Sequence, residues 1–211
     1  MVSNNDQVRI VVLGLQEVGK SALTVRYLTR RFITEYANGI DSAYVHNIAV
    51  RGKSIDVKII DHGVERDPSE LIRWADGFIL VYSIASRESL EEAKCLKKNI
   101  DVIKGLTNRS CCVLVGNKAD LRRQRQVTTG EAIKVAYDIG CRFFEVSAAE
   151  QIEQVHEVFK YTIARTLDRK ERAVVEMTRV IKPHGALEGG KRIFGKRLGM
   201  RNKSRDRTKT L

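Results

Sequence analysis

Four residues near the amino terminus have the types and the spacing needed to hold a phosphate group. Gly14 is followed at fixed intervals by Gly19, Lys20 and Ser21, within the sequence GLQEVGKS. In such a glycine-rich loop, successive backbone N–H groups point toward one anion, and the lysine adds a positive charge. Lys20 is expected to reach the β- and γ-phosphates of a nucleotide, and the Ser21 hydroxyl to bind Mg²⁺. The predicted phosphate site comprises Gly14, Leu15, Gln16, Glu17, Val18, Gly19, Lys20, Ser21 and Ala22.

A second polar stretch, with the sequence NKAD, indicates which base is bound. It starts at Asn117, directly after an apolar run, and ends at Asp120. The Asp120 carboxylate can accept hydrogen bonds from N1–H and the exocyclic amino group of guanine, whereas adenine has no such pair of donors on that edge. Backbone N–H groups after the last predicted strand are expected to face the guanine oxygen. The predicted base site comprises Asn117, Lys118, Asp120, Leu121, Ser147, Ala148 and Ala149.

The hydrophobic pattern predicts an α/β domain that positions both sites. Short apolar runs alternate with segments of helical period, and two of these runs, GFILVYS and CCVLVGN, are continuously apolar, as in strands covered on both faces. We expect strands over 8–14, 44–50, 55–61, 77–84, 111–117 and 141–148, and helices over 20–31, 88–104, 128–140 and 152–170. This order predicts a doubly wound, six-stranded, mostly parallel sheet flanked by helices.

Composition and charge indicate a folded protein with a basic carboxyl-terminal segment. Apolar residues make up 43% of the 211 residues, which is enough for a packed core. The formal net charge is +12, and residues 168–211 contain fourteen Lys and Arg against five Asp and Glu. The longest apolar run, residues 77–85, is too short to span a bilayer. We expect an amino-terminal extension over 1–7, a folded domain over 8–171 and a basic, disordered tail over 172–211.

The tail and the cysteines bear on location and partners. Ile193, Phe194 and Leu198 lie among the basic residues of the tail, a pattern that suits an anionic membrane surface or nucleic acid, with a solvated tail as the plain alternative. No cysteine follows Cys141, so we expect no prenylation. The four cysteines lack metal-ligand spacing and are expected to be buried thiols in a reducing compartment. We therefore expect a cytoplasmic monomer, with a nuclear or peripheral membrane location open through the tail.

Several motifs occur in order and at suitable spacing over roughly Val8 to Leu167: GxxxxGKS, RFITEY, a strand ending at Asp61, GNKAD and EVSA. On these motifs the sequence resembles the Ras family of small GTPases. Within the family, KSALTVRYLTRRFITEYA and RWADGFILVYSI resemble the branch of the Ras-related, oestrogen-regulated growth inhibitor. The resemblance implies that Phe32 lies near the guanine, that Asp61 contacts Mg²⁺ through water, and that residues from about Tyr36 to Tyr44 face effector proteins.

Four departures from the family pattern bear on hydrolysis and on base binding. Gln16 occupies the loop position at which Ras has a glycine, and its side chain is expected to obstruct an arginine finger and the attacking water. Gly39 replaces a threonine that contacts Mg²⁺ and the γ-phosphate. In DHGVE, Val64 replaces the γ-phosphate-sensing glycine, and Glu65 replaces the water-positioning glutamine. Ala149 replaces a lysine, which is expected to weaken packing on the base modestly.

Three interpretations of the activity remain open from the sequence. The first is a GTP-binding enzyme with slow hydrolysis that acts in intracellular signalling, and the intact Lys20, Ser21, Asp61, Asn117 and Asp120 favour it. The second is a pseudo-GTPase that uses the fold as a scaffold and does not cycle, and the departures in the loops favour it. The third, a nucleic-acid-associated protein, rests on the basic tail alone. We expect GTP and GDP binding with slow hydrolysis.

Overall fold

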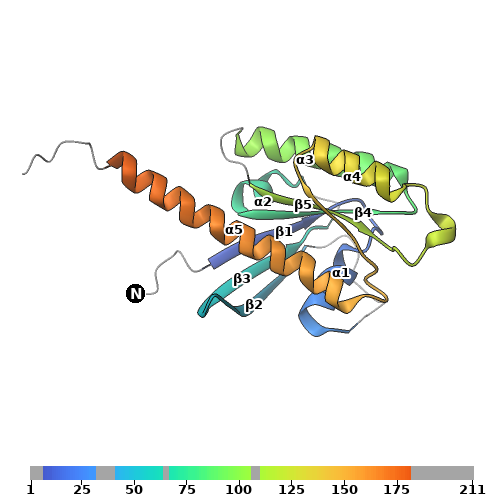
Figure 1. Cartoon of the computed structure of the whole chain (residues 1–211), viewed down its shortest axis with the longest axis horizontal. Coiled ribbons are helices and arrows are strands. Elements are labelled where there is room, and N and C mark those ends of the chain that lie inside the picture. Colours follow the sequence, from blue (N-terminus) through green and yellow to red (C-terminus); the bar gives the residue numbers. More distant parts are fainter. Residues whose placement is uncertain (1–6, 32–40, 64–66, 106–109, 182–211) are drawn as a thin grey trace, which may run out of the picture.

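The computed structural model describes residues 7–31, 41–63, 67–105 and 110–181, with side chains described up to Glu176. Its centre is a six-stranded sheet (Figure 1) formed by β1 (Gln7–Leu13), β2 (Ser42–Val50), β3 (Lys53–Asp61), β4 (Gly77–Ser83), β5 (Cys111–Asn117) and β6 (Arg142–Glu145). The strand order is β2-β3-β1-β4-β5-β6, and β2 runs antiparallel to β3 while the other neighbouring pairs are parallel. The predicted six-stranded, mostly parallel sheet is thus confirmed.

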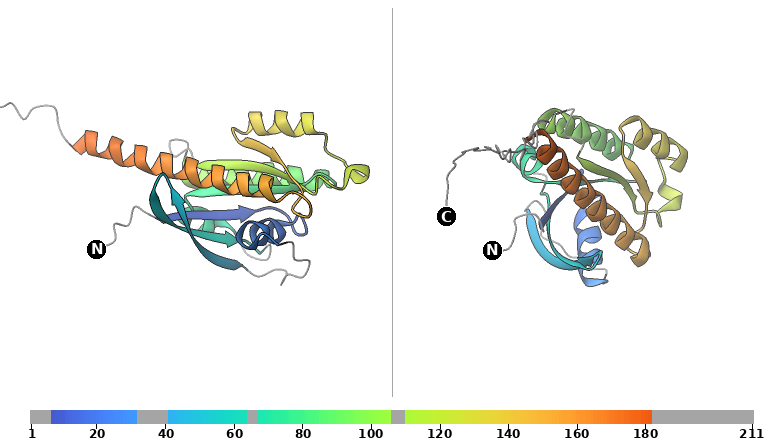
Figure 2. Two further views of the ribbon diagram at one scale, coloured as in Figure 1. Left: turned by 60° about the horizontal axis from the view of Figure 1, so that its bottom comes forward. Right: turned by 60° about the vertical axis from the view of Figure 1, so that its left-hand side comes forward.

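Helices cover both faces of the sheet (Figures 1 and 2). They are α1 (Lys20–Thr29), α2 (Ser69–Trp74), α3 (Arg87–Lys104), α4 (Thr129–Asp138) and α5 (Ile152–Ile181), and a short 3-10 helix, η1 (Arg122–Gln124), lies in the connection after β5 and buries no residue. Helices α1 and α5 pack on one face through residues such as Leu23 and Phe159. Helices α2, α3 and α4 pack on the other face, where Ile72, Leu90 and Ala132 are fully buried.

The two cores follow from the period of two in the central strand. In β1, Val8, Ile10 and Val12 belong to the core beneath α1 and α5, whereas Val11 and Leu13 belong to the core beneath α3 and α4. All residues of β4 and β5 are buried, as the continuous apolar runs predict. Each fully buried aliphatic side chain contributes about 1.5–3 kcal/mol of transfer free energy. The result is a rigid platform for the loops that leave the carboxyl ends of the parallel strands.

Local signals fix several element boundaries. The Thr128 side chain accepts a hydrogen bond from the Glu131 N–H and caps α4, and Ser86 caps α3 in the same way through Ser89. The β2–β3 hairpin turns at Arg51 and Gly52, with φ values of 53° and 77°. Positive φ at both positions matches a type I′ turn, whose twist suits a two-residue hairpin.

One boundary and one cysteine differ from the sequence expectations. The tail was expected to begin at residue 172, but α5 continues to Ile181 and extends beyond the sheet (Figures 1 and 2). The extension contains strong helix formers and no glycine or proline before Pro183, so nothing local ends the helix earlier. Cys95 is exposed on α3, whereas Cys111 and Cys112 are buried as expected. No helix in the described part of the chain is both long and apolar enough to cross a membrane.

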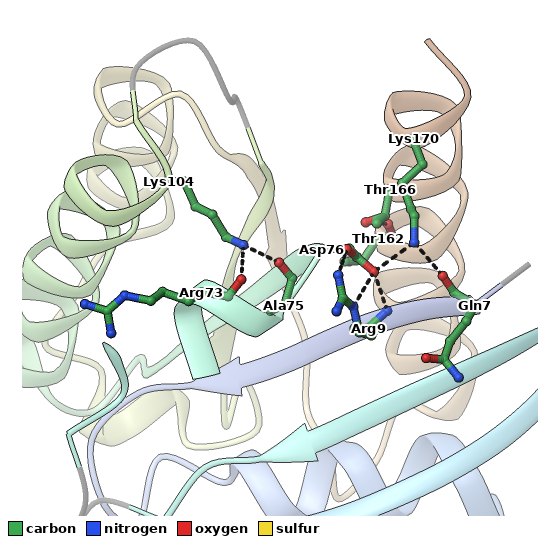
Figure 3. A network of polar contacts seen from close by, with 9 residues as sticks. All are labelled: Gln7, Arg9, Arg73, Ala75, Asp76, Lys104, Thr162, Thr166 and Lys170. Carbon is green, nitrogen blue, oxygen red and sulfur yellow. Dashed lines mark hydrogen bonds and ion pairs between the residues drawn. The ribbon is translucent and has the colours of Figure 1, made fainter. Parts of the chain in front are cut away.

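A network of charges ties α5 to the amino-terminal ends of β1 and β4, at the end of the sheet opposite the predicted nucleotide loops (Figure 3). Asp76 accepts hydrogen bonds from the Arg9 guanidinium at 2.7 and 3.1 Å and from Lys170 Nζ at 3.1 Å. Close by, Lys104 Nζ donates to the carbonyl oxygens of Arg73 and Ala75 at 2.8 and 2.6 Å and so caps the end of α2. These contacts fix the entry into β4 and the position of α5.

Candidate nucleotide-binding site

The loop between β1 and α1 has the backbone conformation that its glycines predict. The φ angle is +151° at Gly14 and +91° at Gly19, a range that residues with side chains rarely adopt. A Cβ atom at Gly14 would lie 2.2 Å from the Val81 carbonyl oxygen, and one at Gly19 would lie 2.3 Å from Asn117 Nδ2. Both positions therefore require glycine for packing as well as for conformation.

Helix α1 begins directly after this loop, and no side chain caps its first N–H groups. Its N-cap residue is Gly19, which has no side chain to accept hydrogen bonds from the first turn. The first turn also contains no acidic residue. The positive end of the helix dipole is therefore not neutralised by the helix itself, and a phosphate group is the ligand that suits it.

Lys20 lies across the loop. Its Nζ donates to the carbonyl oxygens of Gly14 and Leu15 at 3.0 and 2.9 Å, and the residue is 7% exposed. Burial lowers the pKa of Lys20, while the charge of Asp61 acts in the opposite direction. Gln16 and Glu17 are exposed at the tip of the loop. The buried ammonium group thus sits within the loop predicted to bind phosphate.

Ser21 and Asp61 come together at the end of β3. The Ser21 hydroxyl donates to Asp61 Oδ2, and Asp61 is 4% exposed. The other carboxylate oxygen, Oδ1, is buried and has no hydrogen-bond partner among the described residues. Burial raises the pKa of Asp61, against the hydrogen bond from Ser21 and the charge of Lys20. A hydroxyl beside a carboxylate with a free oxygen fits Mg²⁺, which prefers hard oxygen ligands.

Asp41 lies in the segment expected to face effector proteins, and the sequence analysis missed its role within the site. Its Oδ1 lies 2.9 Å from His62 Nδ1 and accepts a hydrogen bond from the Gly63 N–H at 2.8 Å. His62 is buried, with 6% of its surface exposed. The hairpin register pairs Ser42 with Asp61, which brings the residues next to them together. The contact could have been predicted from the register of the hairpin, but that register is known only from the pairing of β2 with β3 in the structure.

Asn117 connects the phosphate loop to the loop after β6. Its Nδ2 donates to the Val18 carbonyl oxygen at 2.9 Å, and its Oδ1 accepts from the Ala148 N–H at 3.1 Å. The side chain is 1% exposed, so both hydrogen bonds are shielded from water. Asn117 therefore fixes the relative position of two loops that are separated by about 130 residues of sequence.

The loop of Asp120 is held against the same segment. The Ser147 hydroxyl donates to Asp120 Oδ1 at 2.6 Å, and the Ser147 N–H donates to Gln151 Oε1 at 3.1 Å. The N–H groups of Ser147 and Ala148, which were expected to face the guanine oxygen, are therefore used within the protein. The Ser147 hydroxyl thus positions Asp120, and the Ala148 N–H positions Asn117.

The remaining predicted residues divide into two groups. Lys118 has a φ of 63° and accepts a hydrogen bond from the Leu121 N–H at 2.9 Å, which closes a turn after β5. The Ala149 carbonyl accepts from Arg26 at 3.2 Å, and Ala22 packs in the core of α1. Residues outside the described ranges are Phe32, Gly39, Val64, Glu65 and the part of the predicted effector segment before residue 41.

Comparison with known proteins agrees with this geometry. The sequence profile of the Ras family matches residues 9–168. The chain is 39% identical over 181 residues to "Ras-related and estrogen-regulated growth inhibitor" of Homo sapiens, covering 84% of this chain and 89% of that protein. It is 36% identical over 172 residues to "Ras-like protein family member 12" of Danio rerio, covering 80% and 68% of the two chains.

A third relative is "Ras-related and estrogen-regulated growth inhibitor-like protein" of Bos taurus, 39% identical over 163 residues, which are 73% of this chain and 80% of that protein. The profile match covers the phosphate loop, Asp61 and the Asn117–Asp120 segment, which are the parts that the fold brings to one edge of the sheet. By its sequence and by its fold, the chain belongs to the Ras family.

Proposed function

We propose that this protein binds GTP and GDP with Mg²⁺, hydrolyses GTP slowly and acts in intracellular signal transduction. The observation that carries the proposal is the double hydrogen bond of Asn117, which joins the phosphate loop to the loop of Ala148. A protein that binds only phosphate has no need to hold these loops in register. A nucleotide that touches both loops at once does need it, because its phosphates and its base lie at a fixed distance.

The roles of the binding residues follow from their positions. The N–H groups at the start of α1 and the Lys20 ammonium would hold the phosphates. Asp120, held by the Ser147 hydroxyl, would accept the two guanine donors. Ser21 and Asp61 would hold Mg²⁺, which neutralises phosphate charge when it is bound, and Asp61 Oδ1 has the unused acceptor capacity that a metal-bound water requires.

Slow hydrolysis is proposed from the residues that replace the catalytic ones of the family. In Ras-like enzymes a glutamine orients the attacking water, and an arginine finger accelerates the reaction by roughly 10³–10⁵-fold. Gln16, exposed on the loop, would obstruct such a finger. Glu65 would place a negative charge where the water must be oriented, beside the phosphates. Both parts of the machinery are therefore weakened, while Lys20 is retained.

The second candidate, a pseudo-GTPase that does not cycle, is favoured by one observation. Asp41 contacts both His62 and the Gly63 N–H, so the start of β2 is tied to the end of β3 by a carboxylate of the protein itself. In ordinary switching, contacts of the γ-phosphate hold these two regions, and hydrolysis releases them. A link that needs no γ-phosphate would leave the GTP and GDP forms nearly alike.

The test is to denature freshly purified protein and identify the released nucleotide by ion-exchange chromatography. Bound GTP or GDP in stoichiometric amount is expected, whereas protein free of guanine nucleotide would overturn the binding proposal. Single-turnover hydrolysis of loaded GTP is then compared with Gln16→Gly, which should be at least tenfold faster. Lys98→Ala, a change at an exposed position of α3 outside the phosphate and base sites, is the control and should leave the rate unchanged.

Hydrogen exchange of the GTP and GDP forms, measured on the unmodified chain and on Asp41→Ala, separates the two candidates. If the protein cycles, hydrogen exchange of β2 and β3 differs between the GTP and GDP forms of the unmodified chain. If Asp41 holds the switch permanently, that difference is absent and appears in the Asp41→Ala variant.

The tail and the effector segment complete the proposal. We propose a cytoplasmic monomer that contacts effector proteins through residues from about Tyr36 to Tyr44. The fourteen basic residues after residue 167 support a peripheral contact with an anionic membrane or with nucleic acid. Sedimentation with vesicles that contain anionic lipid, compared with neutral vesicles and with an RNA oligonucleotide, would distinguish the two partners.

A further inference from the structure

A cavity of about 620 Å³ lies between the carboxyl-terminal end of α1, the edge strand β2 and α5. It is separate from the phosphate loop, which lies at the other end of α1. Leu28, Ile48, Val50 and Ala164 supply apolar wall. Its size falls within the range of roughly 300–1,000 Å³ that small-molecule sites occupy.

One wall of the cavity is aromatic and well ordered. Tyr27 stacks on Phe159 at a centroid distance of 4.3 Å, and its ring also contacts His46 at 5.5 Å and His156 at 5.1 Å. Burial raises the pKa of Tyr27 to about 12, so its phenol is neutral. The wall is therefore held in place by packing before any ligand arrives, which lowers the entropic cost of binding.

The charges around the cavity decide the sign of its ligand. Arg30, Arg51 and Lys160 line it, and no acidic side chain does so among the residues that the structure describes. Arg51 is held by Asp168 at 2.7 Å, whereas the contact of Arg30 with Glu153 is long, at 3.8 Å, and exposed. Lys160 has no ion pair or hydrogen bond within the described residues. A cation would be repelled despite the aromatic wall, and a single negative charge suits the loosely paired Arg30 and the free Lys160.

His156 adds a buried polar atom that lacks a partner. The residue is 8% exposed, and its Nε2 has no hydrogen bond within the part of the chain that the structure describes. Burial and the charges of Arg30, Lys160 and His46 lower its pKa, with Glu153 opposing them, so the imidazole is neutral near pH 7. A ligand oxygen beside this ring would pair it and would favour its protonated form.

We propose that this cavity binds a small amphipathic carboxylate of the fatty-acid class. The apolar chain lies against Leu28, Ile48 and Val50, and the carboxylate lies between Arg30 and Lys160, beside His156. We expect a ligand with a single negative charge because most of the wall is apolar and, among the lining residues, only Arg30 and Lys160 lack a close acidic partner. The proposal is independent of nucleotide binding, since none of these residues belongs to the phosphate or base site.

The test is isothermal titration of the full chain with decanoate, and with 1-decanol as the uncharged probe. Decanoate is expected to bind at least tenfold more tightly than decanol. Lys160→Glu should weaken decanoate binding at least tenfold, and Ala164→Leu should weaken it by narrowing the apolar part of the cavity. Lys98→Glu, an equal change of charge on the exposed face of α3, is the matched control and should bind like the unmodified protein.

A second readout locates the ligand. The C2 proton of His156, followed by NMR across pH, should show a rise in the pKa of His156 when decanoate is present. Undetectable decanoate binding, equal binding of decanol, or unaltered binding to Lys160→Glu would each overturn the proposal. Lys160 is exposed, so its variant tests the proposal even if Ala164→Leu fails to fold.

Discussion

Replacing Asn117 with alanine tests the link between the phosphate loop and the base loop. The change removes two buried hydrogen bonds, to the Val18 carbonyl and from the Ala148 N–H. Each buried group left without a partner costs about 1–3 kcal/mol. Truncation to alanine opens space beside the Val18 carbonyl, and a water molecule that enters this space would restore one of the two bonds, so we expect a total of roughly 2–4 kcal/mol.

This cost should fall mainly on the nucleotide-bound state. Without nucleotide the two loops can relax apart, whereas a bound nucleotide requires both in register. Since about 1.4 kcal/mol corresponds to a tenfold change, release of a fluorescent GDP analogue should become roughly 30- to 700-fold faster. Stopped-flow fluorescence measures the rate, and circular dichroism measures the melting temperature of the same samples.

Asp76→Asn is the control for this experiment. It weakens the network with Arg9 and Lys170 at the opposite edge of the sheet, and so it should lower stability without changing the rate of GDP release. The reasoning about Asn117 is refuted if the alanine variant releases GDP less than threefold faster. It is equally refuted if Asp76→Asn speeds release as much, because general loosening of the fold would then explain both.

Three further predictions concern pH and packing. Burial opposes ionisation of Asp76, but hydrogen bonds from its two basic partners keep its pKa below 3.8. The contribution of Asp76 to stability is therefore complete above pH 3.8 and is lost as the pH falls through the lower pKa of the folded state. In urea unfolding, the difference in stability between the unmodified protein and Asp76→Asn should shrink over that interval. A difference that stays constant would contradict this. Burial raises the pKa of Asp61 above 3.8 in the metal-free protein. The ionised Asp61 carboxylate then destabilises the fold at pH 7, so Asp61→Asn should raise the melting temperature in EDTA. The same variant should abolish the slowing of GDP release by Mg²⁺. A lower melting temperature of Asp61→Asn would contradict the expected effect of burial. Gly19→Ala, with its Cβ 2.3 Å from a side-chain nitrogen and φ of +91°, should cost roughly 2–4 kcal/mol in urea unfolding. Gly130→Ala, which meets no atom within 4 Å, should be neutral or stabilising, and equal losses at the two glycines would show that steric contact is not the cause.

The sequence determined those features that depend on neighbouring residues. The phosphate loop could be predicted because Gly14, Gly19, Lys20 and Ser21 act through a backbone turn only eight residues long. The strands β4 and β5 could be predicted because residues covered on both faces must all be apolar. Asp120 could be predicted from the chemistry of its own NKAD segment, and the family resemblance extended the prediction to Asp61 through a motif that is equally local.

The tertiary structure alone decided which distant groups meet. The contact of Asp41 with His62 depends on the register of β2 on β3, and a shift of one residue would place the two side chains on opposite faces of the hairpin. Asn117 was predicted as a residue of the base site, but only the packing of β5 beside the phosphate loop brings its amide to the Val18 carbonyl. The cavity of His156 likewise exists only where α1, β2 and α5 meet. Such contacts join residues far apart in sequence, so no local pattern specifies them.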